Sequence, residues 1–288
     1  MFANNSVEVS IKGARVKIHA ISTGMVSVKT RFRESSKKGM LAKLDFIFDK
    51  KFTEWMPIWV WVIEHPEGIY LVDTGSNANV NNSDYFKSSG FFASWFNHKM
   101  FKFSIDRDQE IDKQLLKIGI SPNEVKAVIL THLHLDHTDG LRHFPKARIF
   151  VNKLEWEEPF GDLPKLYPEW FKPELIDLDE KYQNFDHAFY LTDAKDLIAI
   201  YTPGHTHGSI SVVLKTDDCD FGFAGDICYH QYQLITNSYS GINASYPSAK
   251  DTYDKFKVLS KTRKLVFLPS HDKEAGNRLE KLIPLSVS

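Results

Sequence analysis

The chain has 288 residues, of which 42% are hydrophobic and 25% are charged, so a sizeable core can form and a disordered chain is excluded. Its 36 basic and 37 acidic residues give a net charge of −1, whereas proteins that bind nucleic acid usually have a basic excess, so no nucleic-acid partner is expected. Two cysteines cannot form a disulfide framework, and no secretory signal or apolar run of roughly 20 residues is visible, so we expect a cytoplasmic protein without a membrane span.

Short runs of β-branched and aromatic residues predict strands along most of the chain. In chain order they are Val16–Ile21, Ile58–Glu64, Ile69–Asp73, Lys126–Thr131, Ala147–Asn152, Leu197–Tyr201, Ile210–Leu214, Phe221–Gly225 and Leu265–Leu268. The sequence Pro66-Glu67-Gly68 between the second and third runs predicts a hairpin turn.

Helical spacing of apolar residues lies between these runs. An amphipathic helix is predicted within residues 36–55, where the apolar positions are Met40, Leu44, Ile47, Phe52 and Trp55. A second helix is predicted around Ile111–Ile118, with Gly119 as its C-terminal cap, and a third over Thr252–Leu259. No repeat or flexible linker divides the chain. Strands interleaved with helices therefore predict one α/β domain over residues 1–288.

The segment Thr131–Asp139, with the sequence THLHLDHTD, holds the densest group of potential metal ligands and directly follows a predicted strand. Residues two apart in an extended chain point the same way, so His132 and His134 can bind one ion together. Asp136 and His137 come where the chain turns into a helix and can face a second ion. Imidazole and carboxylate groups suit zinc and other transition ions.

These four residues cannot fill two coordination shells, so further ligands are expected at other strand ends. Three candidates each follow an apolar strand, although each taken alone could be an ordinary loop residue: His205, Asp226 and His271. Together they complete a site with His132, His134 and His205 on one ion, Asp136, His137 and His271 on the other, and Asp226 bridging the two.

This constellation resembles the metallo-β-lactamase superfamily, for which the HxHxDH motif is highly specific. The resemblance covers most of the chain, from Val72–Gly75 to Ser270–Asp272. It implies an αββα sandwich with the metals at one edge of the two sheets. It also implies that Asp73 is a buried carboxylate that orients a ligand histidine, with a plain turn carboxylate as the alternative. The inserts near residues 31–56 and 76–107 carry no motif of the family.

Tyr229 is the residue that favours one branch of the superfamily. It stands three residues after Asp226, similar to the N-acyl-homoserine lactonases, the quorum-quenching enzymes, where a tyrosine at this offset points at the substrate carbonyl. Thr202–Thr206 also resembles that branch, although His207 stands where the family often has proline. The bridging Asp226 is unlike the true β-lactamases, and no RNA-gripping arm of a tRNA-processing nuclease is evident. An ordinary loop tyrosine is the alternative for Tyr229.

The resemblance implies a dinuclear-metal hydrolase that opens the lactone ring of N-acyl-homoserine lactones by attack of a bridging hydroxide. Two zinc ions are expected, with manganese, cobalt or iron as substitutes. The metals would lower the pKa of the water, Tyr229 would stabilise the oxyanion, and Asp136 would carry a proton to the leaving alkoxide. The alternatives are a thioesterase of the glyoxalase II type, another metallo-hydrolase, or a protein that binds metals without turnover.

Discrimination between acyl chains requires apolar surface beside the metals, and the two inserts offer it. Residues 85–103 contain eight aromatic residues among nineteen, which indicates a core, an acyl pocket or a subunit interface. In the other insert we expect Phe52, Trp55 and Met56 to line the acyl channel, with Phe52 or Trp55 the best single candidate. The family resemblance favours a homodimer, which the sequence itself does not show.

Overall fold

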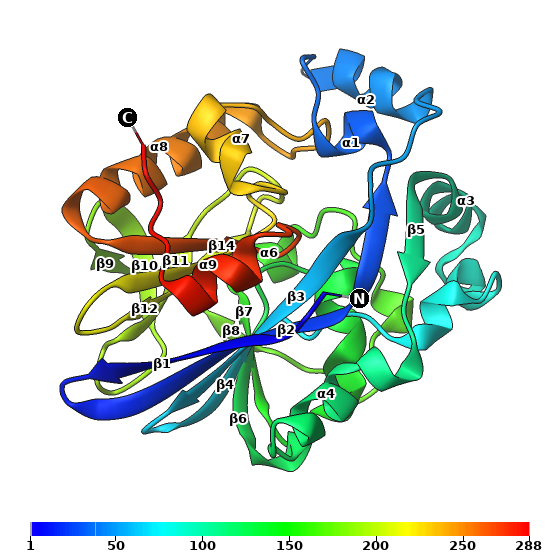
Figure 1. Cartoon of the computed structure of the whole chain (residues 1–288). Coiled ribbons are helices and arrows are strands. Elements are labelled where there is room, and N and C mark those ends of the chain that lie inside the picture. The colour runs from blue at the N-terminus through cyan, green and yellow to red at the C-terminus, as the bar shows by residue number, and fades with distance from the viewer. Residues whose placement is uncertain (1, 38, 288) are drawn as a thin grey trace.

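The computed structural model describes residues 2–37 and 39–287, and its strands form two sheets that pack face to face (Figure 1). The first sheet has the order β1-β2-β3-β4-β6-β7-β8, and β5 pairs with β2. Its strands are β1 (Asn5–Ile11), β2 (Ala14–Val28), β3 (Met56–His65), β4 (Gly68–Val72), β5 (Phe101–Ser104), β6 (Val125–Ile129), β7 (Arg148–Asn152) and β8 (Glu174–Ile176). The strands from β4 to β8 in this order run parallel, and the other pairs are antiparallel.

The second sheet has the order β14-β13-β12-β11-β10-β9. Its strands are β9 (Glu180–Tyr182), β10 (Phe185–Tyr190), β11 (Leu197–Tyr201), β12 (Ile210–Lys215), β13 (Asp220–Gly225) and β14 (Leu265–Pro269). Among the described residues of this sheet, β13 and β14 are the only parallel pair, and the other neighbouring strands are antiparallel. Because β11, β13 and β14 all run in the same direction, their carboxyl ends lie at one edge.

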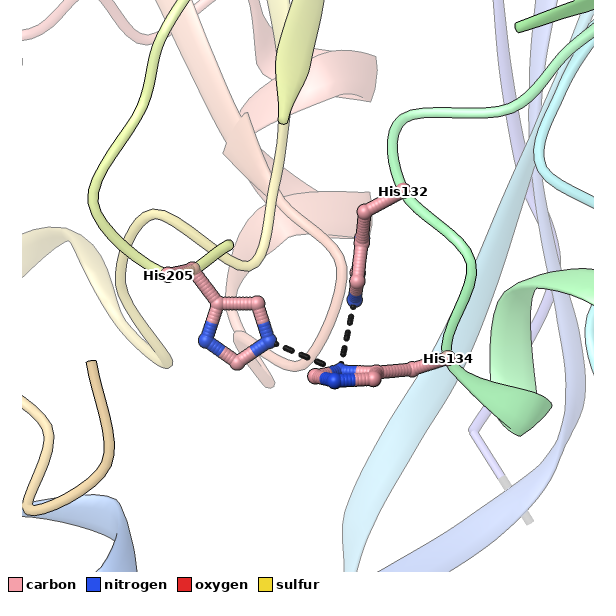
Figure 2. A group of neighbouring side chains, drawn as sticks. All are labelled: His132, His134 and His205. Atoms are coloured by element: carbon pink, nitrogen blue, oxygen red, sulfur yellow. Dashed lines mark hydrogen bonds between the residues drawn. The ribbon is translucent and has the colours of Figure 1, made fainter. Parts of the chain in front are cut away.

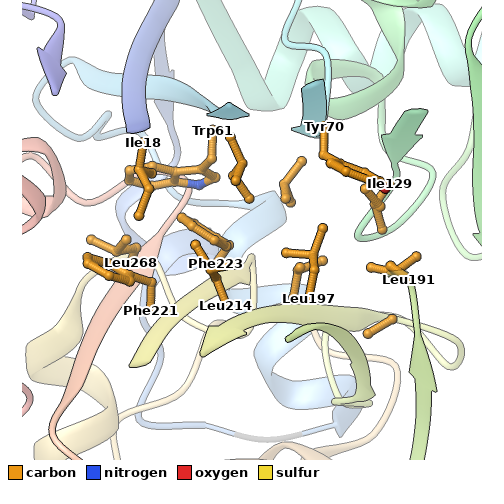
Figure 3. Close-up of a cluster of buried hydrophobic side chains, with 14 of the residues drawn as sticks. Ile18, Trp61, Tyr70, Ile129, Leu191, Leu197, Leu214, Phe221, Phe223 and Leu268 are labelled. Carbon is orange, nitrogen blue, oxygen red and sulfur yellow. The ribbon is translucent and has the colours of Figure 1, made fainter. Parts of the chain in front are cut away.

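The main core lies between the two sheets, as Figure 3 shows. In β3 the side chains of Trp59, Trp61 and Ile63 point into this core, while Val60 and Val62 point to the opposite face. The ring of Trp61 meets that of Phe223 from the second sheet at 5.5 Å between centroids. Both faces of β3 are buried, which explains why its sequence is a continuous apolar run rather than an alternating one.

Helices cover the outer faces of both sheets. α4 buries Ile111 and Leu115 against the first sheet, and α8 buries Tyr253 and Phe256 against the second. The α-helices are α1 (Thr30–Arg33), α2 (Gly39–Ile47), α3 (Phe91–Met100), α4 (Ile111–Lys117), α5 (Leu135–Thr138), α6 (Lys153–Glu157), α7 (Gln231–Thr236), α8 (Tyr246–Thr262) and α9 (Ala275–Lys281). The layers therefore follow the predicted αββα order. No helix in the described part of the chain is both long and apolar enough to cross a bilayer.

Each of the nine predicted strands overlaps an observed one, and the predicted hairpin is present, because His65 pairs with Gly68 across a two-residue turn. Five further strands were not predicted: β1, β5, β8, β9 and β10. They are short or half exposed, so their sequences lack the buried runs that identify the central strands.

The helix predicted within residues 36–55 is shorter than expected. α2 covers Gly39–Ile47, and the chain beyond it is extended, since Phe52 forms an isolated bridge with Lys29. Phe52 instead lies beneath two ammonium groups, with the Nζ atoms of Lys29 and Lys102 at 3.7 and 4.1 Å from its ring centre. The helical spacing of apolar residues thus extended the predicted helix too far, because Phe52 makes cation–π contacts instead of packing on a helical face.

Candidate metal centre

The predicted ligands gather where five strands end. The two parallel strands β4 and β6 lead into Asp73 and Thr131–Asp139, and in the second sheet β11, β13 and β14 lead into His205, Asp226 and His271. Since these carboxyl ends share one edge of the sandwich, the topology brings together residues far apart in the sequence. The structure brings all seven predicted ligands into one cluster, in which His134 and Asp136 are half-buried and the other five are buried.

Three imidazole rings form the first half of this cluster, which we call the three-histidine cluster: His132, His134 and His205. Figure 2 shows their nitrogens converging, with His134 Nδ1 at 3.0 Å from His132 Nε2 and 2.9 Å from His205 Nε2. His132 and His134 come from the loop after β6, and His205 from the loop after β11. The two loops belong to different sheets, so the cluster forms only when the sheets are packed.

The second half, which we call the carboxylate cluster, consists of Asp136, His137, Asp226 and His271. His271 Nε2 is 3.3 Å from Asp136 Oδ2 and 3.2 Å from Asp226 Oδ2. His137 Nε2 lies 3.4 Å from Asp226 Oδ1, and His205 Nε2 of the other cluster lies 3.8 Å from Asp226 Oδ2. Asp226 Oδ2 therefore lies near a histidine of each cluster, and Asp226 Oδ1 lies near His137.

Gly225 allows this position of Asp226. Its φ of +58° is disfavoured for residues with a side chain, and a Cβ atom there would lie 2.9 Å from the side chain of Thr131. A glycine at this position lets the end of β13 approach the loop after β6 closely.

In three of the rings, those of His134, His137 and His271, the outward nitrogen is held by an oxygen atom, which fixes the direction of the inward one. His134 Nε2 is 2.7 Å from the carbonyl oxygen of Phe160, and His271 Nδ1 is 2.9 Å from that of Pro57. His137 Nδ1 donates to Asp73 Oδ2 at 2.8 Å. Such outer contacts orient metal-binding histidines in known sites.

Asp73 ties the two strand ends of the first sheet together. Its carboxylate accepts a hydrogen bond from the backbone N–H of Thr131 at 2.8 Å as well as the one from His137, and its side chain is fully buried. Its φ is +63°, a strained value for a residue with a side chain. The surrounding contacts stabilise this conformation, which directs the carboxylate at His137.

The two clusters differ electrostatically. Burial and the neighbouring histidines lower the pKa of His205 to about 3 and that of His132 well below its usual value. Burial also acts to lower the pKa of His271, but Asp226 and Asp136 outweigh it and raise that pKa to about 10. The three-histidine cluster thus offers neutral lone pairs, whereas in the carboxylate cluster Asp136 and Asp226 favour the protonated form of the neighbouring imidazole of His271.

This donor set fits two divalent metal ions. His137 Nε2 and Asp226 Oδ1 are buried without a hydrogen-bond partner among the described residues, an arrangement that costs free energy unless another group satisfies them. Imidazole nitrogens and carboxylate oxygens are ligands that zinc accepts, and one ion in each cluster would pair the converging atoms.

Glu155 is a residue that the sequence analysis did not identify. It is buried on α6, and its carboxylate accepts hydrogen bonds from the backbone N–H groups of Leu133 and Gly208 at 3.0 and 3.1 Å and from Thr206 Oγ1 at 2.6 Å. Burial raises the pKa of Glu155 to about 7 despite these donors. Glu155 therefore joins the two loops that carry the three-histidine cluster. No motif marks it, because its partners are mostly backbone groups.

Tyr229 lies beside the carboxylate cluster. Its ring stacks on that of His271 at 5.4 Å between centroids, and its backbone N–H donates to Gln233 Oε1 at 2.7 Å. The side chain is buried but lines the cavity described next. Tyr229 thus borders the same cavity as the metal-ligand candidates.

A cavity of about 230 Å³ opens in front of the two clusters. Its polar end is formed by His134, Asp136, His205, Asp226, Tyr229 and His271. Its apolar walls include Val26, Val28, Phe32, Phe92, Phe96, Phe101, Phe103, Leu163 and Ile242. Four of these aromatics belong to the insert 85–103, so part of that insert lines the site.

Phe52, Trp55 and Met56, which we expected to line an acyl channel, are not among the residues that line this cavity. Phe52 is occupied by the two lysines described above, Trp55 is partly exposed in a separate surface hollow, and Met56 is buried in the core behind the wall. The segment turns away because β3 begins at Met56 and carries the chain into the first sheet.

Comparison with known proteins agrees with this geometry. Residues 53–271 match the family model of the metallo-beta-lactamase superfamily. N-acyl homoserine lactonase AiiA of Bacillus thuringiensis subsp. kurstaki is 27% identical over 162 residues, which cover 56% of this chain and 60% of that protein. The match thus spans less than two thirds of that relative's length. N-acyl homoserine lactonase AttM of Agrobacterium fabrum is 25% identical over 248 residues, covering 78% of this chain and 86% of AttM.

Two solved structures have the same fold. An N-acyl homoserine lactone hydrolase with the product N-hexanoyl-L-homoserine bound at its catalytic metal center superposes with a TM-score of 0.73 at 19% identity, covering 94% of this chain and 96% of that one. AidC, a dizinc quorum-quenching lactonase, gives a TM-score of 0.61 at 19% identity, covering 93% and 90%. The family model covers most of the chain, including every predicted ligand, and the chain belongs to the metallo-beta-lactamase superfamily.

Proposed function

We propose that the protein is a dinuclear metal hydrolase that opens the lactone ring of N-acyl-homoserine lactones. The observation that carries this proposal is the two-ended cavity, in which a cluster of seven metal-ligand candidates meets a wall of aromatic side chains. A homoserine lactone has the matching shape, with a polar ring at one end and an apolar acyl chain at the other. The lactonase activity named for AiiA and AttM supports the same substrate class.

His132, His134 and His205 would hold one ion, Asp136, His137 and His271 the other, and Asp226 would contact both. When bound, the two ions would supply a nucleophilic water at neutral pH and positive charge for the ring carbonyl. Zinc is the proposed metal, and manganese, cobalt and iron accept the same donors.

The protein side chains would do the rest of the chemistry. Hydrolysis adds water to the ring carbonyl and breaks the ring C–O bond, so one proton must pass from the water to the departing alkoxide. Asp136 lines the cavity and is the carboxylate proposed to carry that proton. The Tyr229 hydroxyl would donate a hydrogen bond to the carbonyl oxygen as negative charge develops there.

A thioesterase of the glyoxalase II type would have the same ligands but a different substrate. The apolar walls favour an acyl chain over the charged glutathione moiety. The deciding experiment compares hydrolysis of N-hexanoyl-homoserine lactone and S-lactoylglutathione by the same metal-loaded preparation. Turnover of the thioester alone would reject the lactonase proposal.

The first prediction concerns the metals. Freshly purified active protein should contain two divalent ions per chain. Asp226→Asn should weaken the binding of both ions, because Asp226 contacts both clusters. Elemental analysis measures the ion content, and chelation should abolish activity that added zinc, manganese or cobalt restores. Active protein with a single ion per chain would contradict the two-ion proposal.

The second prediction concerns Tyr229. Tyr229→Phe should keep the fold and the ions but lower turnover about 10- to 1,000-fold, the range for loss of one oxyanion donor. Tyr232→Phe is a matched control, because Tyr232 lies on the same segment with 66% of its surface exposed. Steady-state kinetics with elemental analysis test both variants. Equal activity of the two variants would leave Tyr229 without a catalytic role.

The third prediction concerns acyl recognition. Phe96→Ala removes part of the apolar wall, so kcat/KM for long-chain lactones should fall several-fold while short-chain lactones change little. Each buried methylene contributes about 0.8 kcal/mol, or about fourfold in affinity. Phe52→Ala and Trp55→Ala serve as controls outside the cavity. A lactone series of increasing acyl length measures the profile, and an unaltered profile in Phe96→Ala would exclude this wall from recognition.

The fourth prediction concerns Glu155. In Glu155→Gln the amide NH₂ must face at least one of the N–H or O–H donors, so the two histidine loops should be held less firmly. Loss of such supporting contacts typically weakens metal affinity about 10- to 100-fold. Titration against a competing chelator measures this affinity. The exposed Glu157 on the same helix provides the control Glu157→Gln, which should bind metal as the wild type does.

A further inference from the structure

Helix α2 carries apolar side chains on two opposite faces. Ala42 and Phe46 are buried toward the protein, with Phe46 packing against Phe32. The opposite side exposes Met40, Leu41 and Leu44. Phe48 directly follows the helix, and its N–H still bonds the carbonyl of Leu44; Met40 and Phe48 have 77% and 74% of their surface exposed. Residues 40, 44 and 48 lie one helical turn apart, so they form a continuous stripe. A helix whose outer face is apolar normally packs that face against another protein surface or a membrane.

Helix α3 has the same arrangement. Met100 is buried beneath it, while Phe91, Phe92 and Trp95 are exposed on the other side, with Phe91 at 89% and Phe92 at 73%. The two helices are neighbours in Figure 1, and the ring of Phe46 from α2 contacts that of Phe96 from α3 at 6.5 Å between centroids. The exposed residues of both helices, here called the apolar stripes, are Met40, Leu41, Leu44, Phe48, Phe91, Phe92 and Trp95. Exposed apolar side chains in this number mark a binding surface.

The two segments of the chain that carry the stripes contain more basic than acidic residues. Residues 31–56 and 85–103 contain ten basic and four acidic residues, a net charge of +6, whereas the whole chain has −1, so the remaining residues have −7. Lys37, Lys50 and Lys51 line one surface groove together with Leu41, Leu44 and Phe48. The same groove contains Arg31 and the acidic residues Glu34, Asp45 and Asp49, and Lys37 is ion-paired with Asp45, so Lys50 and Lys51 are the lysines that leave an excess of positive charge there. On α3 the Nζ atom of Lys99 lies 4.6 Å from the ring centre of Trp95. Lysines therefore border the apolar side chains on both helices.

We propose that the apolar stripes dock on the surface of an anionic phospholipid bilayer. Amphipathic helices bind such a surface by burying apolar residues at the head-group boundary while lysines contact lipid phosphates. The charge argues against a second copy of the chain as the occupant. A twofold dimer would press this surface against itself, so the lysines beside the stripes of one copy would face those of the other. An anionic lipid surface complements both the apolar residues and the charge.

The experiment is cosedimentation of the full chain with vesicles of phosphatidylcholine alone and of phosphatidylcholine with phosphatidylglycerol. We expect binding to the anionic vesicles at about 0.1 M salt, release at high salt because charge contributes, and little binding to pure phosphatidylcholine. The double variants Phe48→Ser/Phe91→Ser and Lys50→Glu/Lys51→Glu should each lower the partition coefficient at least tenfold. The control Leu116→Ser/Val258→Ser removes two other exposed apolar residues and should bind as the wild type does.

Three results would overturn the proposal. The first is no binding to anionic vesicles, and the second is equal binding to both vesicle types. The third is a dimer in sedimentation equilibrium that Phe48→Ser/Phe91→Ser dissociates, because the stripes would then belong to a second copy. The substituted side chains are exposed, and circular dichroism with thermal melting verifies that each variant is folded. The measurement needs no catalytic activity, so its outcome is independent of the proposed lactonase reaction.

Discussion

The feature around which the structure is organised is the group of imidazole nitrogens and carboxylate oxygens that converge at one edge of the sandwich. At this edge the lone pairs of imidazole nitrogens and carboxylate oxygens face one another. Where no proton lies between two such atoms they repel each other and lack a hydrogen bond, which destabilises the folded chain. The protein maintains this arrangement partly by fixing the outer nitrogen of three rings: Asp73 holds His137, and main-chain carbonyls hold His134 and His271. The fold thus stabilises a cluster that a cation would complete.

Chemistry and recognition come from different parts of the chain. The ligand candidates follow strands of the packed core, whose positions are fixed by burial on both faces. Many of the cavity walls come from the two inserts, which pack mainly on one another and on the strand end of β2. Substitutions in the inserts can therefore change the shape of the cavity while leaving the ligand geometry intact, which is how one fold hosts many substrates.

The central strands and the metal-ligand candidates could be predicted from the sequence because both have local signals. Buried strands have apolar runs, and His132 to His137 are clustered within six residues. Contacts that depend on tertiary packing left no such signal. Glu155 has no distinguishing neighbours in the sequence, and only the packing of α6 places it between two loops. The spacing that assigned Phe52 to a helix could not show that Lys29 and Lys102 lie over its ring.

Phe92 belongs to two surfaces, since it lines the cavity in front of the metal ligands and is also exposed on the outside of α3. A group that binds on either side and restricts the rotamers of this ring alters the free energy of binding on the other side. By thermodynamic reciprocity the two effects must be equal in size and sign. A ligand that restricts this ring from inside the cavity would therefore change how the outer side of α3 binds its surroundings.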